Sequence, residues 1–434
     1  MRAVRRILFV SLWLLCGVSP TAFAEEYTFD ESEIEKKPYH IGGYAELRPV
    51  LFGLDRDASL YKLRFYNRDE GAVLEEYNAA LQLEGSLEAG IARLFVRTNT
   101  DYLNSWQGSH LATTLYEGFL SVKPSSSLTI DLGKKTLKWG KGYAWNPAAF
   151  VDRPKDPDDP EQNLEGFIVA SADYIKSFQG PLKTVSFTPV LVPAFDGVNE
   201  DFGKTGHMNF AAKLYLLLYD TDIDFMALGG GSRPKRYGAD FSRNLRTNFE
   251  IHGEFAFLKD NGRRTLRSSG EVVETENDTA SYLAGMRYLT EADTTYILEY
   301  YRNGTGFTGN EMTDYFAFID NAYNAFVSSG NDLLLQRAAN VTPGNYGRPN
   351  PMKNYLYLRV SRKEPFDILY FTPSVTWIFN TNDRSFSLSP EIQYTGVKNL
   401  DLRLRASVLA RDRFSEFGEK QNDWRAEIRA RYYF

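Results

Sequence analysis

The residues best suited to acid–base chemistry are His252, Glu250 and Glu254, which alternate along one short segment of the sequence. Residues two positions apart in a β-strand point to the same face, so the three side chains would form one cluster. The chain has four histidines, and none has the spacing of a zinc site or of a nucleophile elbow. We therefore predict that the protein is not an enzyme and that it needs no metal or other cofactor.

Carboxylates gather in a second segment, where Asp156, Asp158, Asp159 and Glu161 could offer oxygen ligands to Ca²⁺. The run lacks the D-x-[DN]-x-[DN]-G spacing and the closing Glu of a calcium loop, so we interpret it as a solvated turn. The only cysteine is Cys16, close to the N-terminus. If the leader described below is removed, disulfides, thiolate metal sites and a covalently attached c-type haem are excluded from the remaining chain.

Arginines recur at alternate positions near the C-terminus: Arg403 and Arg405, then Arg425, Arg429 and Arg431. Each group falls on one face of a predicted strand, and the two strands are consecutive, so the sequence predicts a ladder of positive charge. The ladder could form salt bridges within a wall or steer anionic solutes, and we favour the first interpretation. The formal net charge of −6 argues against nucleic acid as a partner.

The segment 139–164 is rich in glycine, proline, aromatic and acidic residues. A connection that only lies in solvent does not need this combination of residue types. We predict that the segment narrows a lumen, and its alternative role is a rigid lid packed on neighbouring loops. The candidate constriction residues are Lys138, Lys141, Asp152, Arg153 and Lys155.

Alternation of apolar and polar residues with a period of two predicts the elements that position these groups. In the last segment Trp424, Ala426 and Ile428 alternate with charged residues, so one face is apolar and the other ionic. The predicted fold class is all-β, a transmembrane antiparallel β-barrel of about 18 strands, or about 16 if one hairpin is lost. The predicted strands are 41–51, 74–87, 89–100, 111–123, 126–138, 165–177, 183–192, 207–219, 222–231, 235–243, 246–259, 279–290, 293–302, 353–363, 366–379, 384–396, 399–410 and 422–434.

The predicted connections differ in length between the two ends of the barrel. All the long ones fall at one end, and short turns at the other, which is the asymmetry of outer-membrane barrels. The longest connection, 303–352, has a helical pattern between Tyr315 and Phe326, with Thr313 as its candidate cap. The predicted outer loops are 52–73, 101–110, 139–164, 193–206, 260–278, 303–352 and 411–421.

Because neighbouring side chains alternate between lipid and lumen, the ionic faces of the strands must point inward, where water solvates them. Positive and negative charges nearly cancel along these faces, which indicates a polar passage without strong preference for one sign of ion. The predicted lumen-lining residues are Arg93, Arg97, Glu250, His252, Glu254, Arg359, Arg403, Arg405, Arg425, Glu427, Arg429 and Arg431.

The N-terminus predicts export. Three arginines among the first six residues precede a mainly apolar stretch, and Ala22-Phe23-Ala24 is typical of a cleavage site. The predicted organisation is a signal peptide at 1–24, a flexible acidic periplasmic segment at 25–40 and a transmembrane β-barrel at 41–434.

Beyond this leader, the chain resembles bacterial porin-like outer-membrane proteins over nearly its whole length, through its strand pattern, its turn asymmetry and its terminal Phe434. The block GKKTLKWGKGYAWNP is similar to strand–loop segments of porin-like families, and the position of 139–164 is similar to that of the inward-folded constriction loop of porins. The resemblance implies residence in the outer membrane with its lipid and lipopolysaccharide, and it implies that Phe434 is a signal read by the barrel assembly machinery.

The predicted function is passive diffusion of small polar or charged solutes through a lumen whose preformed constriction sets solute size. One alternative is a structural barrel that sheaths or anchors a partner, such as a multihaem cytochrome or a surface polysaccharide. A second alternative is an outer-membrane barrel enzyme. The identity of the solute, an open or plugged lumen and association into homo-oligomers are left open.

Overall fold

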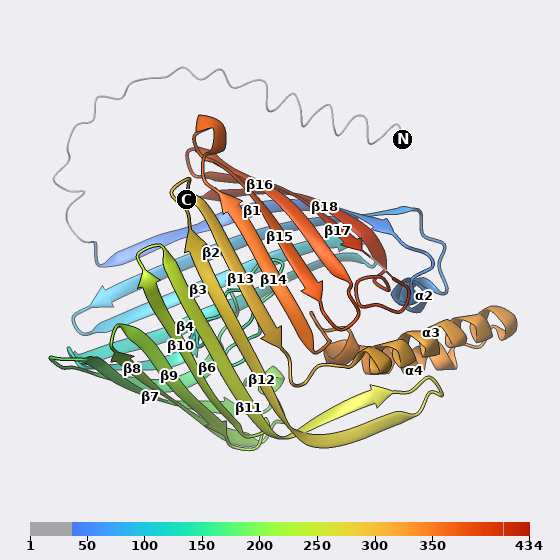
Figure 1. Ribbon diagram of the computed structural model, residues 1–434. Helices are drawn as coiled ribbons and strands as arrows, with labels where there is room; N and C mark the ends of the chain where they lie inside the picture. The colour runs from blue at the N-terminus through green and yellow to red at the C-terminus, as the bar shows by residue number, and fades with distance from the viewer. Residues whose placement is uncertain (1–36, 411) are drawn as a thin grey trace. The chain divides into compact units, whose positions relative to one another are not determined.

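The structure is a computed structural model that describes residues 37–410 and 412–434. The predicted signal peptide, and most of the predicted segment 25–40, lie outside the described residues. A single antiparallel sheet of 18 strands forms the unit Tyr39–Phe434. Its first strand pairs with both the second and the last, so the sheet closes on itself (Figure 1). The prediction of about 18 strands is confirmed, and a barrel of 16 is excluded.

Each strand pairs with its neighbour in the chain, so the barrel is a simple up-and-down meander. The strands are β1 Tyr39–Leu54, β2 Val73–Ala89, β3 Ala92–Ser105, β4 Gly108–Ser125, β5 Leu128–Lys135, β6 Phe167–Ser177, β7 Leu182–Ala194, β8 His207–Leu218, β9 Thr221–Gly229, β10 Arg236–Arg246, β11 Phe249–Leu266, β12 Val272–Leu289, β13 Thr294–Arg302, β14 Asn354–Arg362, β15 Phe371–Asn380, β16 Phe386–Val397, β17 Leu400–Ala410 and β18 Asn422–Tyr433.

The two faces of the wall differ as the alternation predicts. On the paired strands β17 and β18, Leu404 and Ile428 are more than half exposed, whereas their neighbours Arg405 and Arg429 are 6% and 4% exposed. Exposed tyrosines lie near the strand ends, among them Tyr288 and Tyr394. An apolar outer surface bordered by aromatic residues is the exterior of a barrel that sits in lipid.

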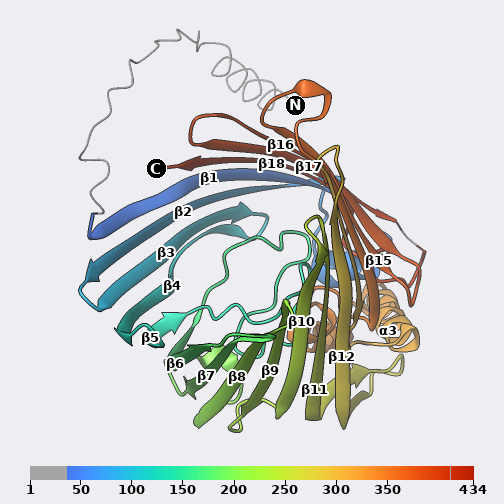
Figure 2. The ribbon, with the colours of Figure 1, turned by 60° about the vertical axis from the view of Figure 1, so that its left-hand side comes forward.

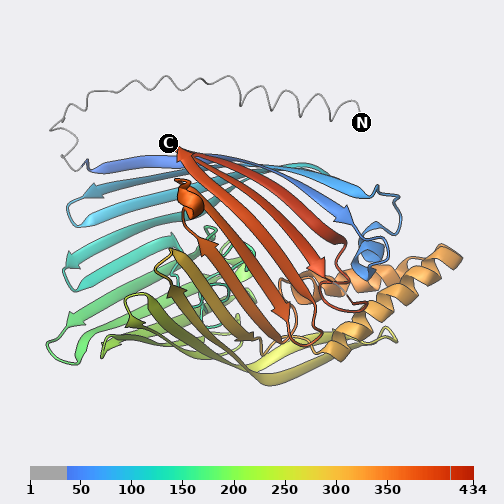
Figure 3. The same ribbon diagram turned by 45° about the horizontal axis from the view of Figure 1, so that its top comes forward.

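Three helices lie in the long connections at one end of the barrel (Figures 1 and 3): α2 Ser59–Phe65, α3 Gly309–Ser329 and α4 Leu333–Val341. The predicted helix exists, but Thr313 as its cap is wrong. Thr308 is the cap, because its side chain and that of Glu311 exchange hydrogen bonds with each other's backbone N–H groups. Short helical turns occur at Glu200–Phe202, Thr342–Tyr346 and Pro365–Asp367. Within the described residues, no helix has the length and apolarity that a membrane span requires.

Two of the predicted long loops are wrong. The predicted loop 101–110 is a tight turn, because β3 runs to Ser105 and β4 begins at Gly108. The predicted loop 260–278 is largely strand, because β11 and β12 continue as a paired ribbon to Leu266 and from Val272 (Figure 1). Cross-strand pairs such as Arg264 with Glu274, at 2.7 Å, hold this ribbon together.

One predicted strand begins too early. The prediction starts at residue 366, but β15 starts at Phe371. A helical turn at Pro365–Asp367 with positive φ at Phe366 takes up the intervening residues. The connections at this end are otherwise short turns, so the predicted difference between the two ends of the barrel is present in the structure.

Candidate functional site

The connection between β5 and β6, residues 136–166, runs through the interior of the barrel and is called here the constriction loop (Figure 2). Its apolar residues pack on the inner side of the wall. Trp139 and Phe150 belong to a buried cluster with residues of β6 to β9 and β11, and Trp145 belongs to another with residues of β11 to β15. The loop therefore covers one side of the lumen and leaves the opposite side to the polar faces of the remaining strands.

Glu254 of β11 holds the first half of the constriction loop. Its Oε1 accepts hydrogen bonds from the backbone N–H groups of Lys141 and Gly142, at 2.7 and 2.6 Å, and its Oε2 accepts one from Ala148, at 3.0 Å. The side chain of Asn146 also donates to Oε1. The backbone N–H dipoles of the loop thus converge on one buried carboxyl group of the wall.

Glu299 of β13 holds the adjoining part of the loop in the same manner. Its carboxylate accepts hydrogen bonds from the backbone N–H groups of Tyr143 and Ala144, the second at 2.9 Å. The Nε2 atom of His252 lies 2.9 Å from Glu299 Oε1. The sequence cluster is only partly kept: Glu250 accepts a hydrogen bond from Ser242 and lies 3.6 Å from His252 Nδ1, whereas Glu254 contacts the loop separately.

Asp152 closes the loop on itself. Its carboxylate accepts hydrogen bonds from the backbone N–H groups of Leu137, Lys138 and Trp139, at 2.8, 3.1 and 2.8 Å. Burial raises the pKa of the Asp152 carboxyl, and the three N–H donors act in the opposite direction. Asp152 therefore shapes the loop, and its predicted role as a constriction residue stays a prediction.

The second half of the constriction loop reaches towards the opposite wall. Asp159 lies 2.8 Å from an Nη atom of Arg429 on β18, and Asn163 donates to Gln82 on β2, at 3.3 Å. The predicted turn is present, since the Asp159 N–H donates to the Asp156 carbonyl at 3.0 Å and Asp156 is exposed, but Asp159 is not simply solvated, because its carboxylate pairs with a wall arginine. The loop thus contacts walls that lie far apart around the barrel, which requires that it cross the lumen.

The predicted ladder arginines lie on this opposite wall and carry carboxylate partners. Arg405 bonds to Glu391, at 2.8 Å from its Nε, and Arg403 pairs with Asp401, at 3.0 Å. The remaining ladder pairs are Arg425 with Glu427 at 3.4 Å, Arg429 with Glu427 at 3.2 Å and Arg431 with Glu46 at 2.7 Å. Outside the ladder, Arg359 of β14 lies 3.4 Å from Glu391. Most of the ladder's charge is therefore offset within the wall.

Other predicted lumen residues lie outside the ladder. Arg97 bridges Glu84 and Glu117, at 3.0 and 2.7 Å, while Arg93 is half exposed and 3.9 Å from Glu88. Sequence reasoning missed Glu117, although its place in the alternating pattern of β4 marks it as a residue of the polar face. It missed the role of Glu299 as an anchor, since no local pattern reveals a contact across the barrel.

The five predicted constriction residues are only partly brought together. Lys138, Asp152, Arg153 and Lys155 line a cavity of about 270 Å³ beside the loop. Lys141 does not line it and pairs instead with Asp224 of β9, at 3.0 Å. Arg153 pairs with Glu165 at 3.1 Å, and Lys155 donates to the carbonyl of Gly142 at 2.8 Å. Over the described part of the chain, no group of three or more His, Cys, Asp or Glu side chains is arranged to hold a metal ion.

Gly140 provides a test of how tightly the loop is held. Its φ is +91°, and a Cβ at this position would lie 2.6 Å from Asn146 Nδ2 and 2.8 Å from Glu254 Oε1. We expect Gly140→Ala to weaken the held position of the loop by roughly 1–3 kcal/mol. Hydrogen exchange of residues 136–166 should rise in this variant. Gly90→Ala is the control, because Gly90 also has a positive φ, +58°, but has open space around it. Hydrogen exchange of the loop should stay at the wild-type level in this control. Equal exchange in the two variants would contradict the prediction.

A closed 18-stranded meander with a connection folded into its lumen has the architecture of a porin barrel. Solved structures share this fold. The chain is 12% identical to a BenF-like porin from Pseudomonas fluorescens Pf-5, with a TM-score of 0.54 over 91% of this chain and 98% of that one. It is 12% identical to Pseudomonas aeruginosa OccK2 (OpdF), solved in complex with glucuronate, with a TM-score of 0.53 over 91% and 98%. It is 11% identical to Acinetobacter baumannii OccAB1, with a TM-score of 0.52 over 92% and 97%.

At these identities the likeness is one of fold. No protein-family model matches the sequence, and no curated protein matches it.

Proposed function

We propose that the protein is an outer-membrane channel through which small polar or charged solutes diffuse passively. The observation that carries this proposal is the constriction loop, held across the inside of a closed barrel by the buried carboxylates Glu254 and Glu299. A loop fixed in this way narrows the lumen without closing a gate, so its position would set the size of the solutes that pass.

The chemistry of the two wall faces supports the proposal. The apolar exterior fits lipid, and the interior carries ionised side chains that need water. Cavities of about 330 and 320 Å³ lie along the polar wall, and both are lined by Asn163 of the loop and Arg431 of β18. A BenF-like porin and a porin solved in complex with glucuronate share this fold, which agrees with solute passage.

The proposal includes the outer membrane as the location, with lipid and lipopolysaccharide around the barrel. It also includes Phe434 as the residue that the assembly machinery reads, since the side chain is half exposed and the backbone pairs with Gly43 at 3.1 Å. We favour the channel over a sheath for a partner protein, because the constriction loop occupies interior space that a sheathed partner would need. We favour it over an enzyme because His252 and Glu254 are engaged in supporting the loop.

Conductance in planar lipid bilayers tests the proposal. The purified mature protein should produce stable single-channel steps, and in liposome swelling assays small sugars and amino acids should enter faster than larger oligosaccharides. Folding is checked separately by the shift in electrophoretic mobility on heating. A correctly folded barrel that gives no steps and admits no solute would refute the proposed function.

A further inference from the structure

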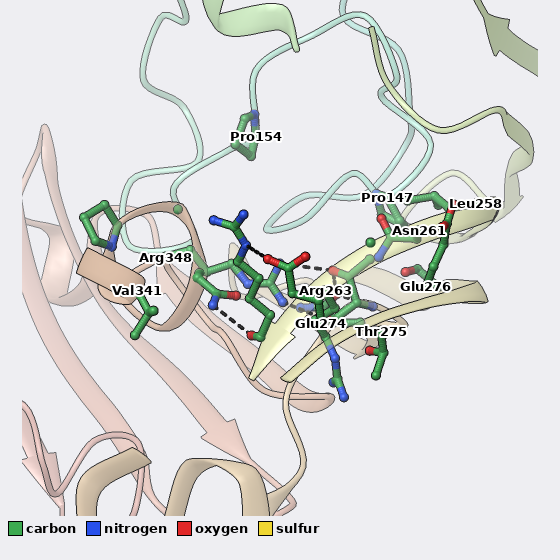
Figure 4. Close-up of a pocket in the computed structure, with 18 of the residues that line it drawn as sticks. Pro147, Pro154, Leu258, Asn261, Arg263, Glu274, Thr275, Glu276, Val341 and Arg348 are labelled. Atoms are coloured by element: carbon green, nitrogen blue, oxygen red, sulfur yellow. Dashed lines mark hydrogen bonds and ion pairs between the residues drawn. The ribbon is translucent and has the colours of Figure 1, made fainter. Parts of the chain in front are cut away.

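The two ends of the barrel differ in where they place large apolar side chains. At the long-loop end, α3 packs its apolar face in a buried cluster, and a cavity of about 900 Å³ there is lined mostly by polar and charged residues (Figure 4). At the short-turn end, residues 363–370 between β14 and β15 form what is called here the β14–β15 turn. In this turn Phe366 is 85% exposed, Leu369 63%, Tyr370 54% and Ile368 48%. So many exposed apolar side chains on one short segment indicate a surface that something apolar covers.

The backbone of the β14–β15 turn is held in a defined shape. Glu364, Phe366, Asp367 and Tyr370 have positive φ, between +49° and +62°, which residues other than glycine seldom adopt. The Tyr370 N–H donates to Glu364 Oε1 at 2.9 Å, and the Thr395 N–H of β16 donates to the Tyr370 carbonyl at 3.1 Å. A strained backbone that its neighbours hold in place indicates a function for the side chains that it presents.

The turn lies on the side of the wall that faces lipid. It projects from the barrel in Figure 1 and lies outside the ring of strands in Figure 2. Exposed side chains of the wall lead up to it: Val375 on β15 is 42% exposed, and Tyr394 on β16, paired with Phe371, is 39% exposed. The apolar surface of the turn is therefore continuous with the exterior that contacts lipid.

Basic side chains border the β14–β15 turn. Arg362, Lys363 and Lys398 are exposed, and none of them forms an ion pair with another described residue. Arg362 follows Val360 by two positions, so it lies on the lipid-facing row of β14. The exposed Asp367 offsets only one of these three charges. Apolar side chains bordered by cations fit the acyl chains and the phosphates of a phospholipid leaflet.

The size of the surface favours lipid over a protein as its occupant. A stable protein interface buries about 800 Å² on each partner, which is more than a single short turn offers. Lipid needs no such area, because it already surrounds the wall from which the turn projects. Other turns at this end expose less apolar surface, for example Ile91 alone between β2 and β3 and Tyr219 alone between β8 and β9.

We propose that the β14–β15 turn anchors the barrel in the phospholipid leaflet at its short-turn end, with Phe366 and Leu369 inserted below the headgroups. The inference is independent of solute passage and rests only on the membrane location that the proposed function includes. It adds an interaction surface outside the strands, at one place on the rim of the barrel.

Fluorescence of a single attached probe tests the anchor. Cys16 is the only native cysteine and lies in the predicted signal peptide, so Leu369→Cys gives the mature protein one site for a bimane label. The labelled barrel is placed in vesicles of phosphatidylethanolamine and phosphatidylglycerol, so dilute that most vesicles hold a single barrel. A phospholipid with a nitroxide on its acyl chain near the headgroup should quench this label at least about threefold more than the same label at Ser126→Cys. Phe366→Cys repeats the measurement if Leu369→Cys does not fold.

Two further positions make the result decisive. Ser126 is exposed in the serine-rich turn between β4 and β5 at the same end, so a label there should stay in water. Leu404 lies on the lipid-facing row of β17, so a label at Leu404→Cys should be quenched if the barrel spans the bilayer. Quenching at Leu404 without quenching at Leu369 would refute the anchor alone, whereas no quenching at either position would refute the membrane location. A blue shift of the Leu369 label without quenching, seen only when several barrels share a vesicle, would assign the turn to a second copy and also overturn the proposal.

Discussion

Replacing Glu254 and Glu299 together by alanine is expected to raise single-channel conductance about twofold or more and to admit larger solutes. Five backbone N–H groups of the constriction loop lose their acceptors in this variant. Each buried donor left without a partner costs about 1–3 kcal/mol, so the loop would leave its position and expose these donors to water. The apolar contacts of Trp139 and Trp145 oppose this movement.

Planar bilayer recordings and liposome swelling with a series of oligosaccharides measure the effect. Glu250→Ala is the matched control, since Glu250 lies on the same strand and the same face as Glu254 but contacts Ser242 and His252 and no group of the loop itself. Its conductance should equal that of the wild type. The prediction fails if the double variant folds, as judged by heat-modifiable mobility, and keeps the wild-type conductance and solute cut-off.

Much of the fold could be predicted because a barrel wall is encoded locally. Each strand alternates between lipid and water, so a stretch such as 422–433 shows its two faces without reference to any other part of the chain. Strand order then follows from connectivity, since every strand pairs with its neighbour in sequence. The errors fall where pairing continues beyond the expected membrane depth, as in the ribbon formed by β11 and β12.

The site could be predicted only in outline. The composition of 139–164 indicates an inward loop, but nothing in it reveals which groups hold its backbone. Glu254 Oε1 accepts hydrogen bonds from the N–H groups of Lys141 and Gly142, which lie 113 and 112 residues away in sequence. The same cause led to the interpretation of His252 and Glu254 as an acid–base cluster. Alternation shows that a side chain faces the lumen, whereas its partner there depends on the path of a loop with no regular period.

The long-loop end contains a buried carboxyl group whose environment leads to a second large effect. Glu416 lies in the connection before β18 and is 2% exposed. Its Oε2 accepts hydrogen bonds from Tyr355 Oη at 2.6 Å and from Asn380 Nδ2 at 2.7 Å, and its Oε1 has no partner among the described residues. Burial raises the pKa of Glu416 to about 7, against the hydrogen bonds and the nearby Lys420, which lower it.

We expect this group to make the protein more stable in mild acid. A carboxyl group whose pKa is higher in the folded than in the unfolded chain binds its proton more tightly when folded, so stability falls as pH rises from the unfolded pKa of 4.5 through the folded pKa of about 7. The full difference is about 3 kcal/mol. Glu416→Gln keeps the size and the acceptor oxygen but cannot ionise. Unfolding free energies of the two proteins should therefore agree at pH 4.5, and at pH 8 the variant should be the more stable by up to this amount. All other groups titrate alike in the two proteins, so parallel curves of unfolding free energy against pH would contradict the raised pKa of Glu416. If the curves diverge, hydrogen exchange of residues 412–421 would show whether the effect arises at this connection.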